Sequence, residues 1–376
     1  MSGAFGSIKH LHQAKNLTFG EIKTIIRDFR DGTTPIYEKF DGQNLMVTYI
    51  NGEVRAARNK SSLKNPYSVI QLNQFFENHL AHVQESFSQA MLAINDLIFY
   101  IDQADFFEDG LVFLNLEIIN PNTRNIVDYG EQKRIIITGA VRTDGQGNII
   151  SHSDISSVDQ FKTDDIFDGW KIELYNRLVY DVNEHIEPTI YEIDKFLELH
   201  GLNDSNTVYD FTDKYVYKLI DKFKLTNQQK IQLKKRWIYG DKSLRMTHVN
   251  FGLSANEILH YEKTSLPADL VDLESTFADI IQNFGINLIN TISDNDTRLS
   301  NIQSILDMYL LGLQHVGNNN INVEKHLVTI KKLGGVNKLK NIEGIVFNHN
   351  DVLYKMTGLF QPINQICGFY KYKNYL

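Results

Sequence analysis

Residues 37–44 read Tyr37-Glu38-Lys39-Phe40-Asp41-Gly42-Gln43-Asn44. A lysine thus stands between acidic side chains, next to a glycine that lets the backbone turn and a ligand come close to the main chain. A lysine amine attacks phosphorus only when it is neutral, and its usual pKa of about 10.4 makes that form rare at pH 7 unless cations or burial lower it. Taken alone, the stretch fits such a nucleophile or an exposed lysine in a surface ion pair.

The flanking residues predict a β scaffold around this stretch. A short strand over 36–40 leads into two apolar runs, 45–50 and 53–58, which are joined by Asn51-Gly52. Asn-Gly favours the positive φ angles of a tight hairpin turn, so we expect an antiparallel pair here. Upstream, Thr18 and Glu21 have the spacing of a helix capping box, and Gly32 stands where a helix should end.

The predicted secondary structure changes in character twice along the chain. Residues 1–150 mix predicted helices with strands, which include 112–119 and 134–142; residues 151–335 favour helix almost throughout; and residues 336–376 return to strands. We therefore expect an α+β protein whose core comprises 1–150 and 336–376, with 151–335 as a helical insertion. Within the insertion, three capping boxes and two closing glycines are predicted, at Thr189/Glu192, Thr226/Gln229, Ser254/Glu257, Gly201 and Gly240.

Composition narrows the class of protein. The chain has 376 residues, a net charge of −8 and a single cysteine, Cys367, so neither a disulfide framework nor a cysteine-based zinc site is expected. No apolar run reaches the roughly 18 residues of a membrane-spanning helix, and the first residues do not have the pattern of a secretory signal. We expect a protein of a reducing cytoplasm (the host cytoplasm if it is viral), with no membrane contact and no protein partner.

Two further strands carry isolated charges. Glu117 lies within the apolar run 113–119, and Glu343 precedes a glycine in the run 341–347. An ionised carboxylate in an apolar strand is costly unless it binds something or faces water. Lys355 follows on the next predicted strand, 352–357. Each residue is individually compatible with a structural role.

Together, and in this order, these segments resemble the covalent nucleotidyltransferase superfamily, which comprises ATP-dependent DNA ligases, RNA ligases and mRNA-capping enzymes. The family's nucleophile motif K-x-D-G is matched by Lys39 to Gly42. Its arginine, glutamate, E-G and lysine motifs are matched by Arg58, Glu117, Glu343-Gly344 and Lys355. Glu38 and Asn44 extend the first motif to E-K-x-x-G-x-N, which is closer to phage-type RNA ligases than to DNA ligases. The resemblance covers residues of about 30–145 and 340–360.

The resemblance implies a ligase-type (ATP-grasp-like) antiparallel core and a role for each matched residue. Lys39 would attack the α-phosphate of ATP, Glu343 would hold Mg²⁺, and Lys355 would contact the α-phosphate. Glu117 would bind the ribose. The remaining residues expected to bind the nucleotide or the acceptor phosphate are Glu38, Asp41, Gly42, Asn44, Arg58 and Ile137.

The chain also departs from the family pattern. The last motif usually has two lysines, whereas here Leu353 and Thr357 flank Lys355 at the alternate positions; Lys338 and Lys340 are candidate substitutes. The aromatic residue that stacks on the base in the family is replaced by aliphatics around Ile137. Only 21 residues follow Lys355, too few for the OB domain of DNA ligases and capping enzymes, so none is expected.

The helical part has a basic segment of its own. Residues 211–247 contain 10 Lys and Arg against 3 Asp and Glu, interleaved with aromatics. Cations beside aromatic rings suit a nucleic-acid strand, although a solvated helix face explains them equally well. The residues expected to contact RNA or DNA are Lys230, Lys234, Lys235, Arg236, Trp237 and Tyr239.

The resemblance predicts an enzyme, an ATP-dependent polynucleotide ligase that favours RNA and acts through a covalent Lys39–AMP intermediate. Two alternatives stay open: a nucleotidyltransferase that serves another acceptor, as in DNA ligation or RNA capping, and a nucleic-acid-binding protein that kept the fold and lost turnover. The sequence leaves open the donor nucleotide (ATP, GTP or NAD), the form of the acceptor end and the oligomeric state.

Overall fold

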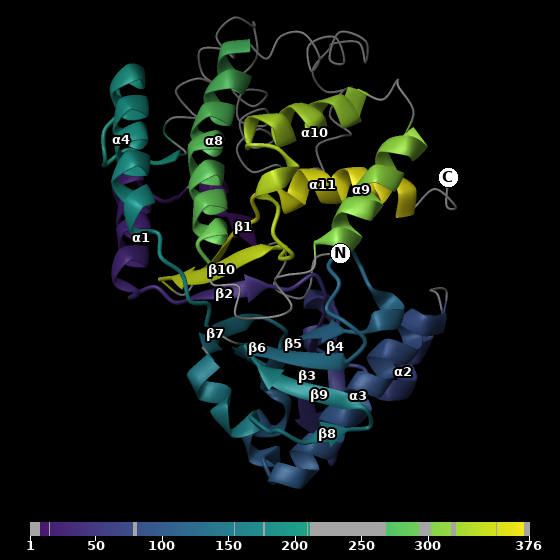
Figure 1. The fold of residues 1–376 in the computed structure, drawn as a ribbon. Helices are drawn as coiled ribbons and strands as arrows, with labels where there is room; N and C mark the ends of the chain where they lie inside the picture. Colours follow the sequence, from purple (N-terminus) through teal and green to yellow (C-terminus); the bar gives the residue numbers. More distant parts are fainter. Residues whose placement is uncertain are drawn as a thin grey trace, which may run out of the picture. The chain divides into compact units, whose positions relative to one another are not determined.

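The chain is a mixed α+β protein with a curled, mainly antiparallel sheet and several helices (Figure 1). The computed structural model describes residues 8–14, 16–77, 81–153, 155–175, 177–208, 210, 268–292, 302–316, 321–350 and 352–371. These residues form two compact units, one of 1–8, 35–180 and 289–376 and the other of 9–34 and 181–288. Residues 9–34 fall in the same unit as residues 181–288, and residues 289–335 fall in the same unit as residues 35–180.

The first unit contains a larger sheet of seven described strands. Their order is β4–β3–β5–β6–β9–β8, with β7 paired to β6, and every pairing is antiparallel except that of β6 with β9. The strands are β3 (Gln43–Ile50), β4 (Glu53–Ala57), β5 (Val112–Ile119), β6 (Lys133–Thr143), β7 (Ile149–Ser153), β8 (Ile166–Phe167) and β9 (Trp170–Leu174).

A smaller sheet in the same unit has the order β11–β10–β2, all antiparallel. Its strands are β2 (Ile36–Lys39), β10 (Gly344–His349) and β11 (Val352–Met356). The helices of this unit are α2 (Val69–Phe75), α3 (Ala81–Ile101), α9 (Gln303–Val316), α10 (Ile321–Lys332) and α11 (Phe360–Lys371).

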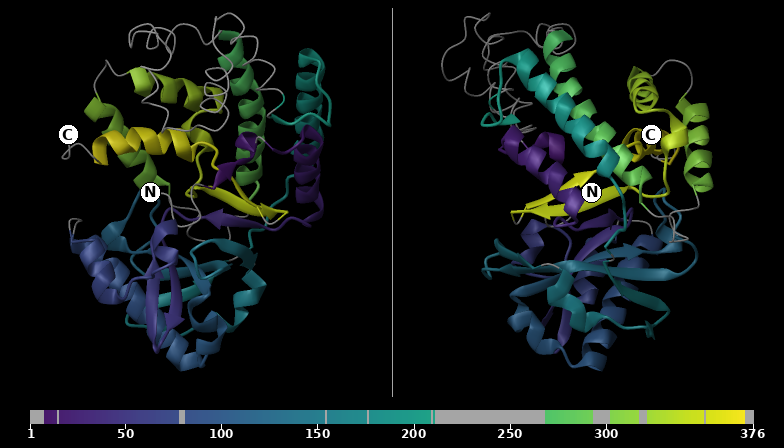
Figure 2. Two further views of the ribbon diagram at one scale, coloured as in Figure 1. Left: turned by 180° about the vertical axis from the view of Figure 1, so that it is seen from behind. Right: turned by 60° about the vertical axis from the view of Figure 1, so that its left-hand side comes forward.

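One face of the larger sheet packs into the main hydrophobic core, and the other face bears the polar residues of the strands. Alternate residues such as Leu45, Leu116 and Ile137 point into the main hydrophobic core, where α3 contributes Phe87 and Ile94. Figure 2 shows α2 and α3 along this side of the sheet. The intervening residues, which include Asn44 and Glu117, therefore point to the opposite face.

In the part of the second unit that the structure describes, helices are accompanied by one short strand. This part contains β1 (Lys9–His10), α1 (Phe19–Asp31), α4 (Asn183–His200) and most of α8 (Ala268–Asn290). Phe19 contacts Phe196 and Phe277, with ring centroids 6.0 and 5.2 Å apart. The buried Lys23 ammonium lies 2.7 Å from Asp194 and 2.5 Å from Asp204, so an ion-paired network joins α1 to α4 and to the turn that follows it.

Several local predictions are confirmed. Thr18 and Glu21 form both hydrogen bonds of the capping box, and Gly32 ends α1 in the left-handed conformation. Asn51 and Gly52 have φ of 53° and 85° between β3 and β4, as the Asn-Gly turn requires. Gly201 ends α4 in the same left-handed way as Gly32.

Two local predictions are wrong. Residues 151–335 are not almost entirely helical, because β8 and β9 extend the larger sheet; Trp170 and Ile172 alternate with polar residues, so one face of β9 is buried in the core. Thr189 does not begin a helix. It lies inside α4, where its hydroxyl donates to the His185 carbonyl at 2.7 Å. The capping residues predicted at 226–229 and 254–257, and Gly240, lie outside the described residues.

Candidate active site

Lys39 and Glu343 meet because β2 and β10 are neighbours. Lys39 is the last residue of β2 and pairs with Gly344, the first residue of β10, so Glu343 stands beside it. The Lys39 Nζ lies 2.5 Å from Glu343 Oε1, and the two side chains are only 20% and 16% exposed. Lys355 belongs to β11 and pairs with Val346 on the other side of β10. One small sheet thus positions three of the charged residues.

The larger sheet supplies Glu117, Asn44 and Arg58. Asn44 on β3 lies opposite Glu117 on β5. The Asn44 side-chain Nδ2 donates to Asn115 Oδ1 at 2.8 Å, and the main-chain carbonyl of Asn44 accepts from the buried Arg58 guanidinium at 2.6 Å. Arg58 also lies over the Phe87 ring, 5.4 Å from the centroid. Arginine, asparagine and glutamate are therefore held against one another by contacts within this sheet.

The charges of the two sheets act on one another. Burial raises the pKa of Glu117 to about 7, opposed by Lys39 and Arg58 and reinforced by Glu343. Burial likewise raises the pKa of Glu343 to about 7, although Lys39 and Lys355 oppose the rise. These couplings show that the face of the larger sheet bearing Glu117 looks toward Lys39 and Glu343.

Lys39 is protonated in this ligand-free arrangement. Burial lowers the pKa of Lys39, but the negative charges of Glu343, Glu117 and Asp41 outweigh burial, so the net pKa is above the usual lysine value. Burial lowers the pKa of Lys355, with Lys39 adding to the effect. A nucleophilic role for Lys39 thus requires a ligand or cation that draws the carboxylates away from its ammonium.

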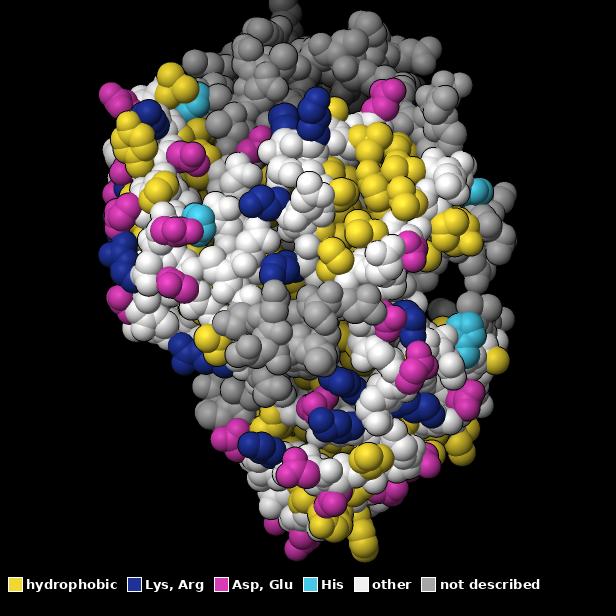
Figure 3. Space-filling view, viewed as in Figure 1, with side chains coloured by type: hydrophobic (Ala, Val, Ile, Leu, Met, Phe, Trp, Pro, Cys, Tyr) yellow, Lys and Arg dark blue, Asp and Glu magenta, His cyan; other side chains and the backbone are white. Residues whose placement is uncertain are grey.

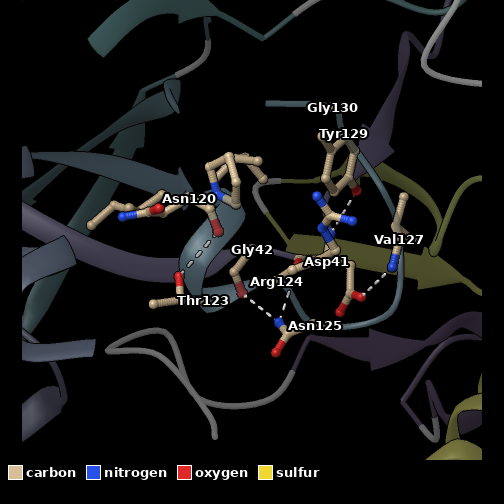
Figure 4. A pocket seen from close by; sticks show the side chains of 12 residues that line it. Asp41, Gly42, Asn120, Thr123, Arg124, Asn125, Val127, Tyr129 and Gly130 are labelled. Atoms are coloured by element: carbon tan, nitrogen blue, oxygen red, sulfur yellow. Dashed lines mark hydrogen bonds between the residues drawn. The ribbon is translucent and has the colours of Figure 1, made fainter. Parts of the chain in front are cut away.

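Asp41 is fixed by the loop between β5 and β6. Its carboxylate accepts the backbone N–H groups of Ile126 and Val127 at 2.7 and 3.0 Å, and its own N–H donates to Tyr129 Oη at 2.8 Å. Asn125 donates to the Asp41 carbonyl at 3.0 Å. Figure 4 shows Asn125, Val127 and Tyr129 around Asp41 and Gly42, beside a small pocket that opens to solvent. The loop therefore holds the backbone two residues beyond Lys39.

Tyr175 holds the same backbone on the other side of Lys39. Its hydroxyl donates to the Glu38 carbonyl, and its ring stacks on Tyr37 with centroids 4.9 Å apart and an interplanar angle of 6°. Phe40 contacts both tyrosines, with ring centroids 5.6 Å from Tyr129 and 5.8 Å from Tyr175. Residues 38–41 are thus bound through their main chain on both sides of the lysine.

Steric crowding explains both glycines of the matched motifs. A Cβ on Gly42 would lie 2.9 Å from Ile119 Cδ1 and 3.1 Å from Glu117 Oε2. A Cβ on Gly344 would lie 2.8 Å from the Thr357 Cα, and the Met356 carbonyl oxygen is closer still. The side chain of Thr357 also packs here, which leaves Lys355 as the lysine of this strand.

Some of the residues that were expected at the site lie away from Lys39 and Glu343. Ile137 is fully buried in the main core on the opposite face of β6, and Ile136 is the residue that lies beside Glu117. Glu38 is buried on β2, opposite Ile345. Lys338 is exposed and Lys340 is partly exposed, just before Glu343. The basic residues expected to contact nucleic acid, from Lys230 to Tyr239, lie outside the described residues.

Sequence reasoning missed Asn125, Tyr129 and Tyr175. Asn125 and Tyr129 belong to a polar loop with no helical or strand period, where a lone tyrosine is the only signal. Tyr175 follows a strand that was expected to be helix. These residues form hydrogen bonds to main-chain groups that are far away in the sequence. Such bonds leave no characteristic spacing of residues from which they could be predicted.

The donor set suits one particular kind of metal site. Among the described residues, no group of three or more His, Cys, Asp or Glu side chains is arranged to hold a metal ion. Glu343 and Glu117 offer hard carboxylate oxygens, and Mg²⁺ in phosphoryl-transfer sites commonly uses one or two carboxylates together with substrate phosphates and water. Glu343 and Glu117 are therefore the carboxylates of this site whose oxygens could hold a Mg²⁺ ion.

Comparison with known proteins gives no assignment: no protein-family model matches the chain, and no curated protein shows significant similarity to it. Within the described residues, no helix is both long and apolar enough to cross a membrane. The fold and site define a mixed α+β protein with a buried lysine–carboxylate centre where two sheets of one unit meet.

Proposed function

We propose that this protein is an ATP-dependent polynucleotide ligase, with RNA as the favoured substrate, built on a ligase-type nucleotidyltransferase core. The observation that carries the proposal is the 2.5 Å contact between Lys39 and Glu343, with Glu117 and Lys355 coupled to the same pair. Three regions far apart in the sequence supply these groups, with Glu343 and Lys355 both from the β10–β11 hairpin region. Their order along the chain is the order of the motifs of the covalent nucleotidyltransferases.

In the first step, the lone pair of Lys39 Nζ attacks the α-phosphorus of ATP. The Lys39 ammonium must first give one proton to water to expose this lone pair. The N–P bond then forms, the bond from the α-phosphorus to the bridging oxygen breaks, pyrophosphate leaves, and the nitrogen gives a second proton to water. Glu343 would hold Mg²⁺, which supplies neutralisation of the phosphate charge. Lys355 would contact the α-phosphate and Glu117 the ribose hydroxyls. Positioning and charge neutralisation of this kind are the main means of catalysing transfer at phosphorus.

The AMP would then pass from Lys39 to the 5′-phosphate of a polynucleotide, which frees the lysine. Attack by a 3′-hydroxyl on that activated phosphate forms the phosphodiester and releases AMP. Asn44 and Arg58 would meet the acceptor phosphate. The proposal is supported by Arg58, whose Nε is buried and has no hydrogen-bond partner among the described residues.

Incubation with α-labelled ATP and Mg²⁺, followed by a denaturing gel, tests the proposal. We expect label on the wild type and on Lys162→Ala, an exposed lysine elsewhere in the first unit, but not on Lys39→Ala. A phosphoramidate is labile to acid and stable to alkali, so the label should share both properties. Absence of label from ATP, GTP and NAD in pyrophosphatase-treated protein would refute the proposal and favour a binding protein of the same fold.

A further inference from the structure

The segment that leads into Glu343 is basic. Residues 325–342 contain five lysines and no aspartate or glutamate, in a chain whose net charge is −8. Figure 3 shows Lys and Arg side chains on this face at the end of α10 and again toward β10. A concentration of one sign of charge on a chain of the other sign marks a place where a partner of opposite charge is attracted.

The backbone of this segment is fixed and directs the lysines outward. Leu333 and Leu339 are buried, with 4% and 5% exposure, whereas Lys331 and Lys332 just before Leu333, and Lys338 between the two leucines, are exposed. Two consecutive glycines with φ of 93° and 78° end α10 and turn the chain into the next segment. The cations are therefore held on an ordered scaffold.

The helix dipole accounts for only part of this charge. Lys331 and Lys332 lie in the last turn of α10, where cations are favoured by the exposed carbonyl groups. Lys338 and Lys340 lie beyond the helix and gain nothing from it. Neither Lys331 nor Lys338 has a carboxylate within 4.0 Å among the residues that the structure describes. Their charges are available to a partner.

The segment also ends at the site. Lys340 is three residues and Lys338 five residues before Glu343, so their Cα atoms lie within about 11 and 18 Å of it even in a fully extended chain. Asn341, between them and Glu343, is fully buried and donates to the Asp128 carbonyl at 3.4 Å. A strand bound along these lysines would thus have its end close to Lys355 and Lys39.

We propose that Lys331 and Lys338, with Lys332 and Lys340 beside them, form a surface that binds the phosphates of a single polynucleotide strand whose 5′ end enters the site. This inference rests on the proposed function, since a phosphorylated end is what the site would activate. Successive phosphates of a single strand lie several ångströms apart, so separate lysines can each contact one of them.

Salt dependence of binding tests the surface without any chemistry. The probe is a 5′-phosphorylated, fluorescently labelled 12-nucleotide RNA, titrated with full-length protein without ATP at 50–300 mM KCl. Each phosphate contact on a single strand contributes about 0.7 to the slope of log Kd against log salt concentration. We expect Lys331→Gln/Lys338→Gln to lower that slope by about 1.4, which corresponds to roughly 25-fold weaker binding at 0.1 M if the affinities converge at 1 M.

The matched control is Lys162→Gln, which removes an exposed positive charge from the same unit away from this segment. Its slope should equal that of the wild type, and all variants should unfold at the wild-type temperature. Equal slopes for the double variant and the wild type, or no RNA binding by the wild type at 50 mM KCl, would overturn the proposal that these lysines bind the phosphates of RNA. Self-adenylylation is assayed separately in Lys331→Gln, where it should be unchanged, so failure of the surface and failure of the lysyl–AMP chemistry give different results.

Discussion

The phenolic oxygen of Tyr129 accepts the main-chain N–H of Asp41 at 2.8 Å, two residues beyond Lys39. The same loop reaches the other side of the centre, because the Asp128 carbonyl accepts from Asn341 Nδ2 at 3.4 Å, two residues before Glu343. One connection between β5 and β6 thus binds the chain next to both members of the lysine–glutamate pair. The geometry of that pair depends on a loop that contributes neither residue.

Replacing Tyr129 by phenylalanine should therefore slow the modification of Lys39. The ring would still pack on Phe40, but the Asp41 N–H would lose its acceptor, and leaving a buried donor unsatisfied costs about 1–3 kcal/mol. We expect a lower melting temperature and a slower single-turnover formation of lysyl–AMP. Tyr191→Phe, at a ring 59% exposed, is the control and should change neither quantity. An unchanged rate in Tyr129→Phe would show that this hydrogen bond does not position Lys39.

Lys355 should matter for the rate of the first chemical step. It is the cation of β11 that is coupled to Lys39 and Glu343, and the alternate position 357 is occupied by a packed threonine. Removing one preorganised charge that faces a transferring phosphoryl group commonly costs about 10²–10³ in rate. We expect Lys355→Met to slow lysyl–AMP formation by about 10²-fold in single-turnover assays, and Lys355→Arg to restore part of the loss. Equal rates for Lys355→Met and the wild type would exclude such a role.

Local rules predicted much of the scaffold. The capping box at Thr18, the Asn51-Gly52 turn and the strand that carries Glu117 depend on residues close together in sequence, and all three are confirmed. The pairing of Lys39 with Glu343 was expected only through resemblance to a family. Nothing in the spacing of residues 39 and 343 shows that β2 and β10 are neighbours, since strand order depends on long-range packing.

The errors have identifiable causes. Ile137 was expected at the site only through the family resemblance. Successive residues of a strand point to opposite faces, so Ile136 lies beside Glu117 and Ile137 faces the core. β9 was missed because the short run 170–174 lies among residues that favour helix. Its neighbour Tyr175 was missed for the same reason.

The glycine after Glu343 should be essential for a steric reason. An alanine at 344 would bring Cβ against the backbone of Met356 and Thr357, so β10 and β11 must separate. We expect Gly344→Ala to lower the melting temperature and to abolish lysyl–AMP formation, because Gly344 is also the partner of Lys39. Gly130→Ala is an informative comparison, since it has φ of 80° and open space, so only backbone strain of about 1–2 kcal/mol is added. Normal labelling of Gly344→Ala would contradict the observed strand packing.

The buried carboxylates should also make the stability of the ligand-free protein depend on pH. Burial raises the pKa of both Glu117 and Glu343 to about 7, from about 4.5 for an exposed glutamate. Between these values the folded protein binds more protons than the unfolded chain. By linkage, the free energy of unfolding falls as pH rises through this window. The two groups favour folding most at pH below 4.5 and oppose it above pH 7.

Glu117→Gln removes one of these titrations while keeping the shape of the side chain. At pH 5 the wild type and the variant should have similar free energies of unfolding. By pH 8 the variant should be the more stable by about 1–3 kcal/mol, because each unit of pKa shift corresponds to about 1.4 kcal/mol. The loss of the counter-charge of Arg58 in the variant offsets part of this gain. Thermal or urea unfolding of both proteins from pH 5 to pH 8.5, without nucleotide, measures the difference. A difference that stays constant over this range, or grows in favour of the wild type, would show that Glu117 is ionised without penalty, and the electrostatic coupling of the two sheets described above would then be wrong.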